Sequence, residues 1–74
     1  MWEVVGMRQR VSKDKVYYDI CLSRDFKSPG QGLEVRSGSY AADQIGYIPR
    51  IGDKVVVELG NYQGREYIKD IEVM

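Results

Sequence analysis

The stretch that decides the fold is YIPRIGDKVVVELGNYQGREYIKDIEV, residues 47–73. Pro49 and the turn signal Gly52-Asp53 precede a run of β-branched residues, Val55–Val57, and such residues favour strands. A Gly/Asn-rich loop over residues 60–64 then returns the chain for a further strand. We therefore predict that the chain ends in a β-hairpin, as small β-barrels do.

The register of this last hairpin stays open at the level of sequence. Alternation places Val55, Val57 and Leu59 on one face of its first strand. In the second strand Ile71 and Val73 share one parity, whereas Ile68 has the other. Either a bulge near Lys69-Asp70 brings all three inward, or Ile68 points outward.

A first hairpin is predicted from strands at residues 2–11 and 15–23, joined by a turn at Ser12–Asp14. Centring the turn between Lys13 and Asp14 sorts the residues into an apolar and a polar face, and a one-residue slip would destroy that sorting. The pairs on the apolar face are Val11 with Val16, Gln9 with Tyr18, Met7 with Ile20, and Val5 with Leu22; on the polar face they are Arg10 with Tyr17, Arg8 with Asp19, and Gly6 with Cys21. Trp2 and Val4 share the parity of Arg8, so we expect an outward apolar patch there that meets a second copy of the protein.

The middle of the chain supplies a third strand at residues 33–37, with Leu33 and Val35 facing inward. Residues 24–32 form a loop, in which Phe26 either plugs the barrel end or is an exposed contact. Residues 39–45 are long enough for one helical turn, and Tyr40 and Tyr47 are expected to cover the core.

Five strands with a longer connection between the third and fourth are the order of an OB-fold. We predict an all-β protein, a small five-stranded OB-like barrel, formed by residues 1–74 as one domain. An SH3-like barrel is the alternative.

Composition argues against catalysis. The chain has no histidine, and Cys21 is its only cysteine, so we expect a buried or half-buried thiol that packs and does not react. The carboxylates alternate with lysines and arginines, as on a solvated surface. We therefore expect no enzyme, no cofactor and no metal site. A lone cysteine suits a reducing cytoplasm, and we expect neither a signal peptide nor a membrane span.

Charge is balanced overall, with eleven basic and eleven acidic residues. That balance counts against a strongly electrostatic nucleic-acid binder. The distribution is uneven, however: residues 8–27 hold six basic and three acidic side chains, whereas residues 51–74 hold three and five. One basic face is therefore compatible with the sequence.

The candidate nucleic-acid-binding residues combine cations with aromatic rings, because rings stack on bases and cations hold phosphates. They are Arg8, Arg10, Lys13, Lys15, Tyr17, Arg36 and Tyr62. Arg8, Arg10 and Tyr17 share the outer face of the first hairpin, and Arg36 has a parity that could bring it near them. The alternative is that these residues only stabilise the fold: Arg8 pairs with Asp19, and Tyr17 covers a neighbouring strand.

Three stretches, residues 2–6, 35–39 and 49–64, together resemble the small single-stranded DNA-binding, helix-destabilising proteins of filamentous-phage type and their relatives on phages and mobile elements of Gram-positive bacteria. The resemblance implies an OB-like barrel that dimerises and coats single strands. The residues to which the resemblance assigns a role in binding the strand are Arg8, Arg10, Lys15, Tyr17 and Tyr62. The neutral net charge departs from the family pattern.

The function predicted from these observations is sequence-tolerant binding of single-stranded nucleic acid, DNA in preference to RNA, by a cytoplasmic homodimer. The alternative is an SH3-like protein-interaction module, such as a phage or plasmid accessory factor. It would use Phe26, Tyr40 and Tyr47 as a peptide groove.

Overall fold

The computed structural model describes all residues 1–74 and contains five strands and no helix. The strands are β1 (Trp2–Ser12), β2 (Lys15–Asp25), β3 (Leu33–Ala41), β4 (Lys54–Tyr62) and β5 (Arg65–Val73). They form one antiparallel sheet in the order β3-β2-β1-β4-β5. The predicted small all-β, OB-like architecture is confirmed. The structure offers no helix long and apolar enough to cross a membrane.

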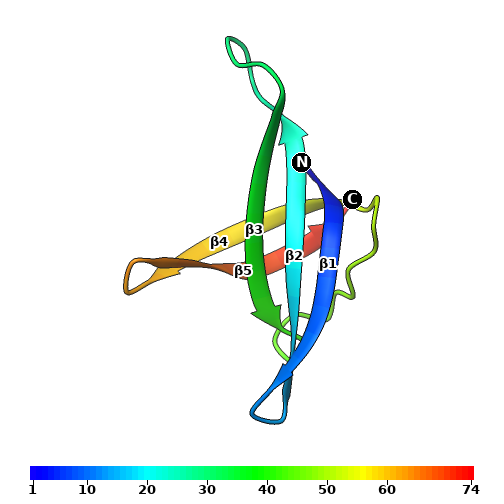
Figure 1. The fold of residues 1–74 in the computed structure, drawn as a ribbon, viewed down its shortest axis with the longest axis vertical. Helices are drawn as coiled ribbons and strands as arrows, with labels where there is room; N and C mark the ends of the chain where they lie inside the picture. Colours follow the sequence, from blue (N-terminus) through cyan, green and yellow to red (C-terminus); the bar gives the residue numbers. More distant parts are fainter.

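In Figure 1, β3, β2 and β1 lie side by side at the front, and the β4–β5 hairpin crosses behind them and projects to the left. The termini lie near each other at the upper right. The expected helical turn over residues 39–45 is smaller than predicted, because β3 continues to Ala41. A single turn follows, in which the Ile45 amide donates to the Ala41 carbonyl at 3.4 Å.

The first hairpin has the predicted register over most of its length, from Ser12 paired with Lys15 to Gly6 paired with Cys21. Lys13 and Asp14 form its two-residue turn with φ of 51° and 63°. Positive φ at both turn residues matches the right-handed twist of the flanking strands.

A β-bulge at Val5 corrects the prediction for the beginning of β1. The ladder shifts between Val4 and Gly6, so Leu22 pairs with Val4 and not with Val5. Because the extra residue resets the alternation, Trp2 and Val4 turn into the core, with 7% and 0% of their surface exposed, and Val5 turns outward. The prediction that Trp2 and Val4 form an outward apolar patch was wrong.

The core lies between the β1–β2–β3 layer and the β4–β5 hairpin. Its nine buried residues are Trp2, Val4, Ile20, Leu22, Tyr40, Ile45, Val55, Ile68 and Ile71. β3 and β5 approach at Gly38, where an added Cβ would lie 2.8 Å from the Ile68 side chain. No ladder joins these two strands, so the barrel is open along this line.

The last hairpin contains a bulge that brings Ile68 inward, which is the first of the two predicted alternatives. Glu58 pairs with Asp70 and the next pair is Leu59 with Ile68, so Lys69 is the extra residue. Ile68 and Ile71 are both buried, whereas Val73 is exposed at the strand end.

The inward face of β3 is opposite to the one predicted. Leu33 and Val35 are 61% and 64% exposed, because the unbroken β2–β3 register pairs Val35 with Ser23 and places Arg36 beside Leu22. Cys21 shares that outer face and is exposed, with its Sγ 4.0 Å from the Ser37 hydroxyl. The expected buried or half-buried thiol was wrong.

The two tyrosines flanking the long connection cover the core as predicted. Tyr40 is buried and Tyr47 is partly buried against the core. The Tyr40 hydroxyl donates to the Tyr47 carbonyl at 2.8 Å, and the Tyr47 hydroxyl donates to Asp53 at 2.8 Å. Burial raises the pKa of both phenols. Phe26, by contrast, is exposed in its loop and plugs nothing.

Candidate nucleic-acid interface

The outer face of β1, β2 and β3 carries a polar cluster centred on Asp19. Arg8 donates to Asp19 from Nε at 3.1 Å and from Nη2 at 2.8 Å, and Arg10 donates from Nε at 3.0 Å. The Ser39 hydroxyl of β3 adds a hydrogen bond of 2.6 Å. One carboxylate thus links all three strands and holds two guanidinium groups in fixed positions.

These donors lower the pKa of the Asp19 carboxyl from 3.8 to about 2, the hydrogen bond from Ser39 having the largest effect, followed by those from Arg8 and Arg10. A carboxyl whose pKa is depressed on folding stabilises the protein above its unfolded pKa, and this contribution is lost as the pH falls through its folded pKa.

We therefore predict that Asp19 contributes fully to the free energy of unfolding above about pH 4, and that this contribution disappears as the pH falls toward 2. Urea unfolding at pH 5 and at pH 2.5 should show a larger loss of stability for the wild type than for Asp19→Asn. Equal losses for the two proteins would mean that these hydrogen bonds do not stabilise the fold.

An arginine and an aromatic ring lie together beside the carboxylate. The Arg10 guanidinium carbon lies 4.7 Å from the centre of the Tyr17 ring, and the two residues are direct cross-strand partners. Their placement on one outer surface is as predicted. Arg8 pairs with Asp19, as expected if it stabilises the fold, but its side chain remains 75% exposed.

A hollow of about 780 Å³ opens over this face, from Arg8 and Asp19 to Glu66 and Tyr67 of β5. Tyr67 is a wall of this hollow that sequence reasoning missed. Its ring lies against Gly60, where an added Cβ would come within 2.4 Å of the ring. The pairing of Gly60 with Tyr67 could have indicated this role, but that signal depends on a register that the sequence left open.

Lys13 and Lys15 lie at the tip of the first hairpin, and both are exposed. Lys15 lines a neighbouring depression together with Arg10, Tyr17 and Tyr67. The basic and aromatic surface therefore continues from the hollow toward this tip.

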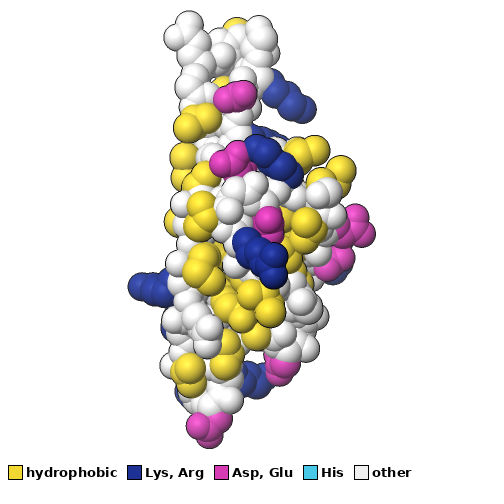
Figure 2. All heavy atoms as spheres, turned by 90° about the vertical axis from the view of Figure 1, so that its right-hand side faces the viewer, with side chains coloured by type: hydrophobic (Ala, Val, Ile, Leu, Met, Phe, Trp, Pro, Cys, Tyr) yellow, Lys and Arg dark blue, Asp and Glu magenta, His cyan; other side chains and the backbone are white.

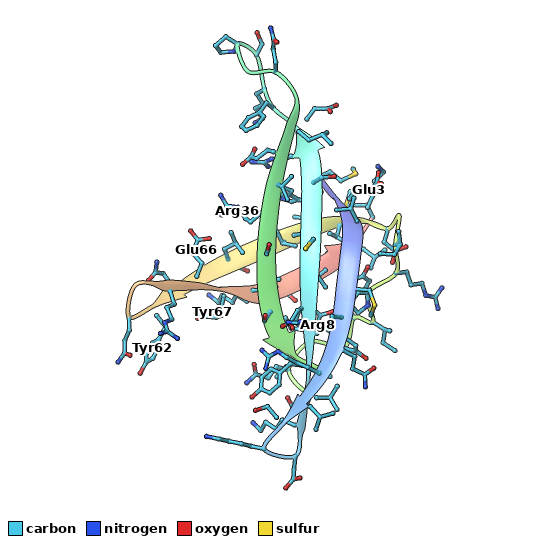
Figure 3. The ribbon with its side chains drawn as sticks, in the orientation of Figure 1. Glu3, Arg8, Arg36, Tyr62, Glu66 and Tyr67 are labelled. Carbon is cyan, nitrogen blue, oxygen red and sulfur yellow. The ribbon has the colours of Figure 1, made fainter.

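Arg36 does not join the cluster, which corrects its predicted position. It lies on the inward face of β3, 3.0 Å from Glu66 and with its guanidinium 6.0 Å from the Trp2 ring. Figure 3 shows Arg36 and Glu66 directed toward each other from β3 and β5. The structure assigns Arg36 to the contact between these strands.

Tyr62 is also separate from the cluster. It lies at the tip of the β4–β5 hairpin, far from Arg8 (Figure 3), and is 68% exposed. The three aromatic residues of the alternative peptide groove are not brought together either, since Tyr40 is buried and Phe26 is exposed in the loop beyond β2.

Seen from the β1 side, cations and carboxylates are interspersed and surround apolar side chains (Figure 2). No large basic patch covers this side, in keeping with the neutral net charge. The chain contains no group of three or more potential metal ligands.

Comparison of the chain with protein-family models, curated proteins and solved structures gives no match. The function is therefore inferred from the residues and geometry of the site itself.

Proposed function

We propose that this protein binds single-stranded DNA on the outer face of β1–β2–β3 with little dependence on base sequence. The observation that carries the proposal is the Arg10–Tyr17 pair next to a hollow walled by Tyr67. Aromatic rings beside cations are how proteins hold single strands without reading their sequence.

The arginines keep donors for phosphate even while they hold Asp19. Arg8 uses Nε and Nη2 and Arg10 uses Nε in those hydrogen bonds, and a guanidinium carries five N–H donors. The remaining donors can bind phosphate oxygens, while Asp19 keeps the side chains ordered. Lys15 extends the positive charge toward the hairpin tip.

The two rings provide stacking platforms on either side of β3. Tyr67 is 43% exposed, and Tyr17 is partly exposed. Each stacked base typically contributes about 1–3 kcal/mol. Every base has a π-face, so this arrangement supports binding that tolerates any sequence.

The proposal is tested by the fluorescence anisotropy of a labelled oligothymidine. Because Arg8, Arg10 and Lys15 supply about three phosphate contacts, a plot of log K against log salt should have a slope of about −2. An oligouridine of equal length tests the preference for DNA. No binding at low salt would reject the proposal.

Removing either ring should weaken binding. We expect Tyr17→Leu and Tyr67→Leu each to lower affinity roughly 5- to 150-fold, the equivalent of about 1–3 kcal/mol per lost stack. Tyr62→Leu is the matched control, because its ring is exposed but lies outside the hollow. Equal losses for all three variants would place the binding surface elsewhere.

A further inference from the structure

The first half of β3 has a free backbone edge. β3 pairs only with β2, and no ladder joins it to β5. Its contact with β5 is made by the Arg36 side chain, which reaches Glu66, and at Gly38, which faces Ile68. The backbone groups on the outer edge of residues 33–37 therefore have no partner strand.

Of the devices that normally prevent pairing with another chain, this edge lacks lysine, proline and a bulge and has only the two opposite charges of Glu34 and Arg36. Residues 33–37 read Leu-Glu-Val-Arg-Ser, and the β2–β3 register is unbroken over nine pairs. Leu33 and Val35 point outward and are 61% and 64% exposed. The strand is regular and apolar on its outer side, and its charges would oppose a partner strand that does not match them.

We infer that two copies of this chain pair through antiparallel β3 strands, about a two-fold axis that passes between the two copies of Val35. A two-fold axis perpendicular to the sheet keeps the outer faces of both copies on one side. Residues that pair across the interface must then share the same parity, because paired side chains lie on the same face. The axis therefore passes between the two copies of a single residue. An axis at Glu34 or at Arg36 would set like charges opposite each other, which is destabilising. The axis at Val35 pairs Glu34 of each copy with Arg36 of the other.

The charges around this axis alternate in sign. Within one copy Arg24 holds Glu34 at 2.9 Å and Arg36 holds Glu66 at 3.0 Å. Pairing through Val35 joins these two ion pairs into a row across the interface. A second copy is therefore the partner that this edge fits, in preference to an unrelated extended peptide.

The two five-stranded sheets would join into one, with β1-β2-β3-β3-β2-β1 at its centre, and both Asp19 clusters would lie on the same side. A five-residue strand pair is small, and interfaces below about 1,200 Å² belong to transient complexes. We therefore expect a dimer that forms as the protein concentration rises.

Sedimentation equilibrium without nucleic acid tests the interface independently of DNA binding. We expect the wild type to dimerise and Val35→Lys to remain monomeric at the same concentrations. Val11→Lys is the matched control, because Val11 is equally exposed, at 69%, but lies on β1. A wild type that stays monomeric up to its solubility limit, or a Val35→Lys variant that dimerises normally, would overturn the inference.

A cross-link tests the register. In a Cys21→Ser background we expect Val35→Cys to form an intermolecular disulfide under mild oxidation, because paired Cα atoms in an antiparallel ladder lie within disulfide range. Leu33→Cys should not form one, since the two positions would be about 13 Å apart along the strands. A cross-link at residue 33 but not at 35 would contradict the proposed axis.

Discussion

Replacing Arg8 and Arg10 together by glutamate is expected to lower the affinity for oligothymidine by at least about 100-fold. Each charge-assisted contact contributes about 1.5–3 kcal/mol, so the loss of two contacts accounts for this factor. The new carboxylates also lie beside Asp19 and repel phosphate. Anisotropy titrations at low salt measure the effect, and the salt dependence of the remaining binding should become shallower.

Two further variants separate a specific site from general electrostatics. Lys27→Glu with Arg50→Glu changes the net charge equally, and neither residue forms an ion pair, so we expect a loss of less than about tenfold from long-range charge alone. Asp19→Asn should act in the opposite direction and raise the affinity, because it frees donors of both arginines. If Lys27→Glu with Arg50→Glu reduced binding as strongly as the arginine pair, the assigned face would be wrong.

Leu22→Ala is expected to remove a large share of the protein's stability. Leu22 is 1% exposed in the middle of the core, and truncating such a residue costs about 2–5 kcal/mol. A domain of this length has a total stability of roughly 4–11 kcal/mol. Circular dichroism during urea unfolding should show a much lower midpoint or no folded baseline.

Leu33→Ala is the control, measured in dilute protein so that self-association does not contribute. Leu33 is 61% exposed, and its truncation should change stability by less than about 0.5 kcal/mol. A comparable loss for both leucines would contradict the inward and outward faces of β2 and β3 described above.

Several parts of the fold were predictable because they depend on interactions between neighbouring stretches of chain. The turn at Lys13–Asp14 and strict alternation set the β1–β2 register, which placed Arg10 and Tyr17 on one face. The Gly/Asn loop after β4 marked the last hairpin, and the parity of Ile68 indicated where a bulge would be needed.

The inward face of a strand, in contrast, depends on what covers it. Alternation in β3 is equally consistent with Val35 or Arg36 facing inward, and the crossing β4–β5 hairpin selects Arg36. Cys21 is exposed for the same reason, since it shares the outer face of Val35. In β1 the extra residue Val5 reverses the parity of everything before it.

By itself the sequence determined a five-stranded β-protein and a basic, aromatic outer face on its first hairpin, since turns and alternation act over a few residues. Only the tertiary structure brought Tyr67 of β5 to that face and took Arg36 away from it. Both depend on the approach of β3 to β5 at Gly38, a contact between residues thirty positions apart that no local pattern encodes.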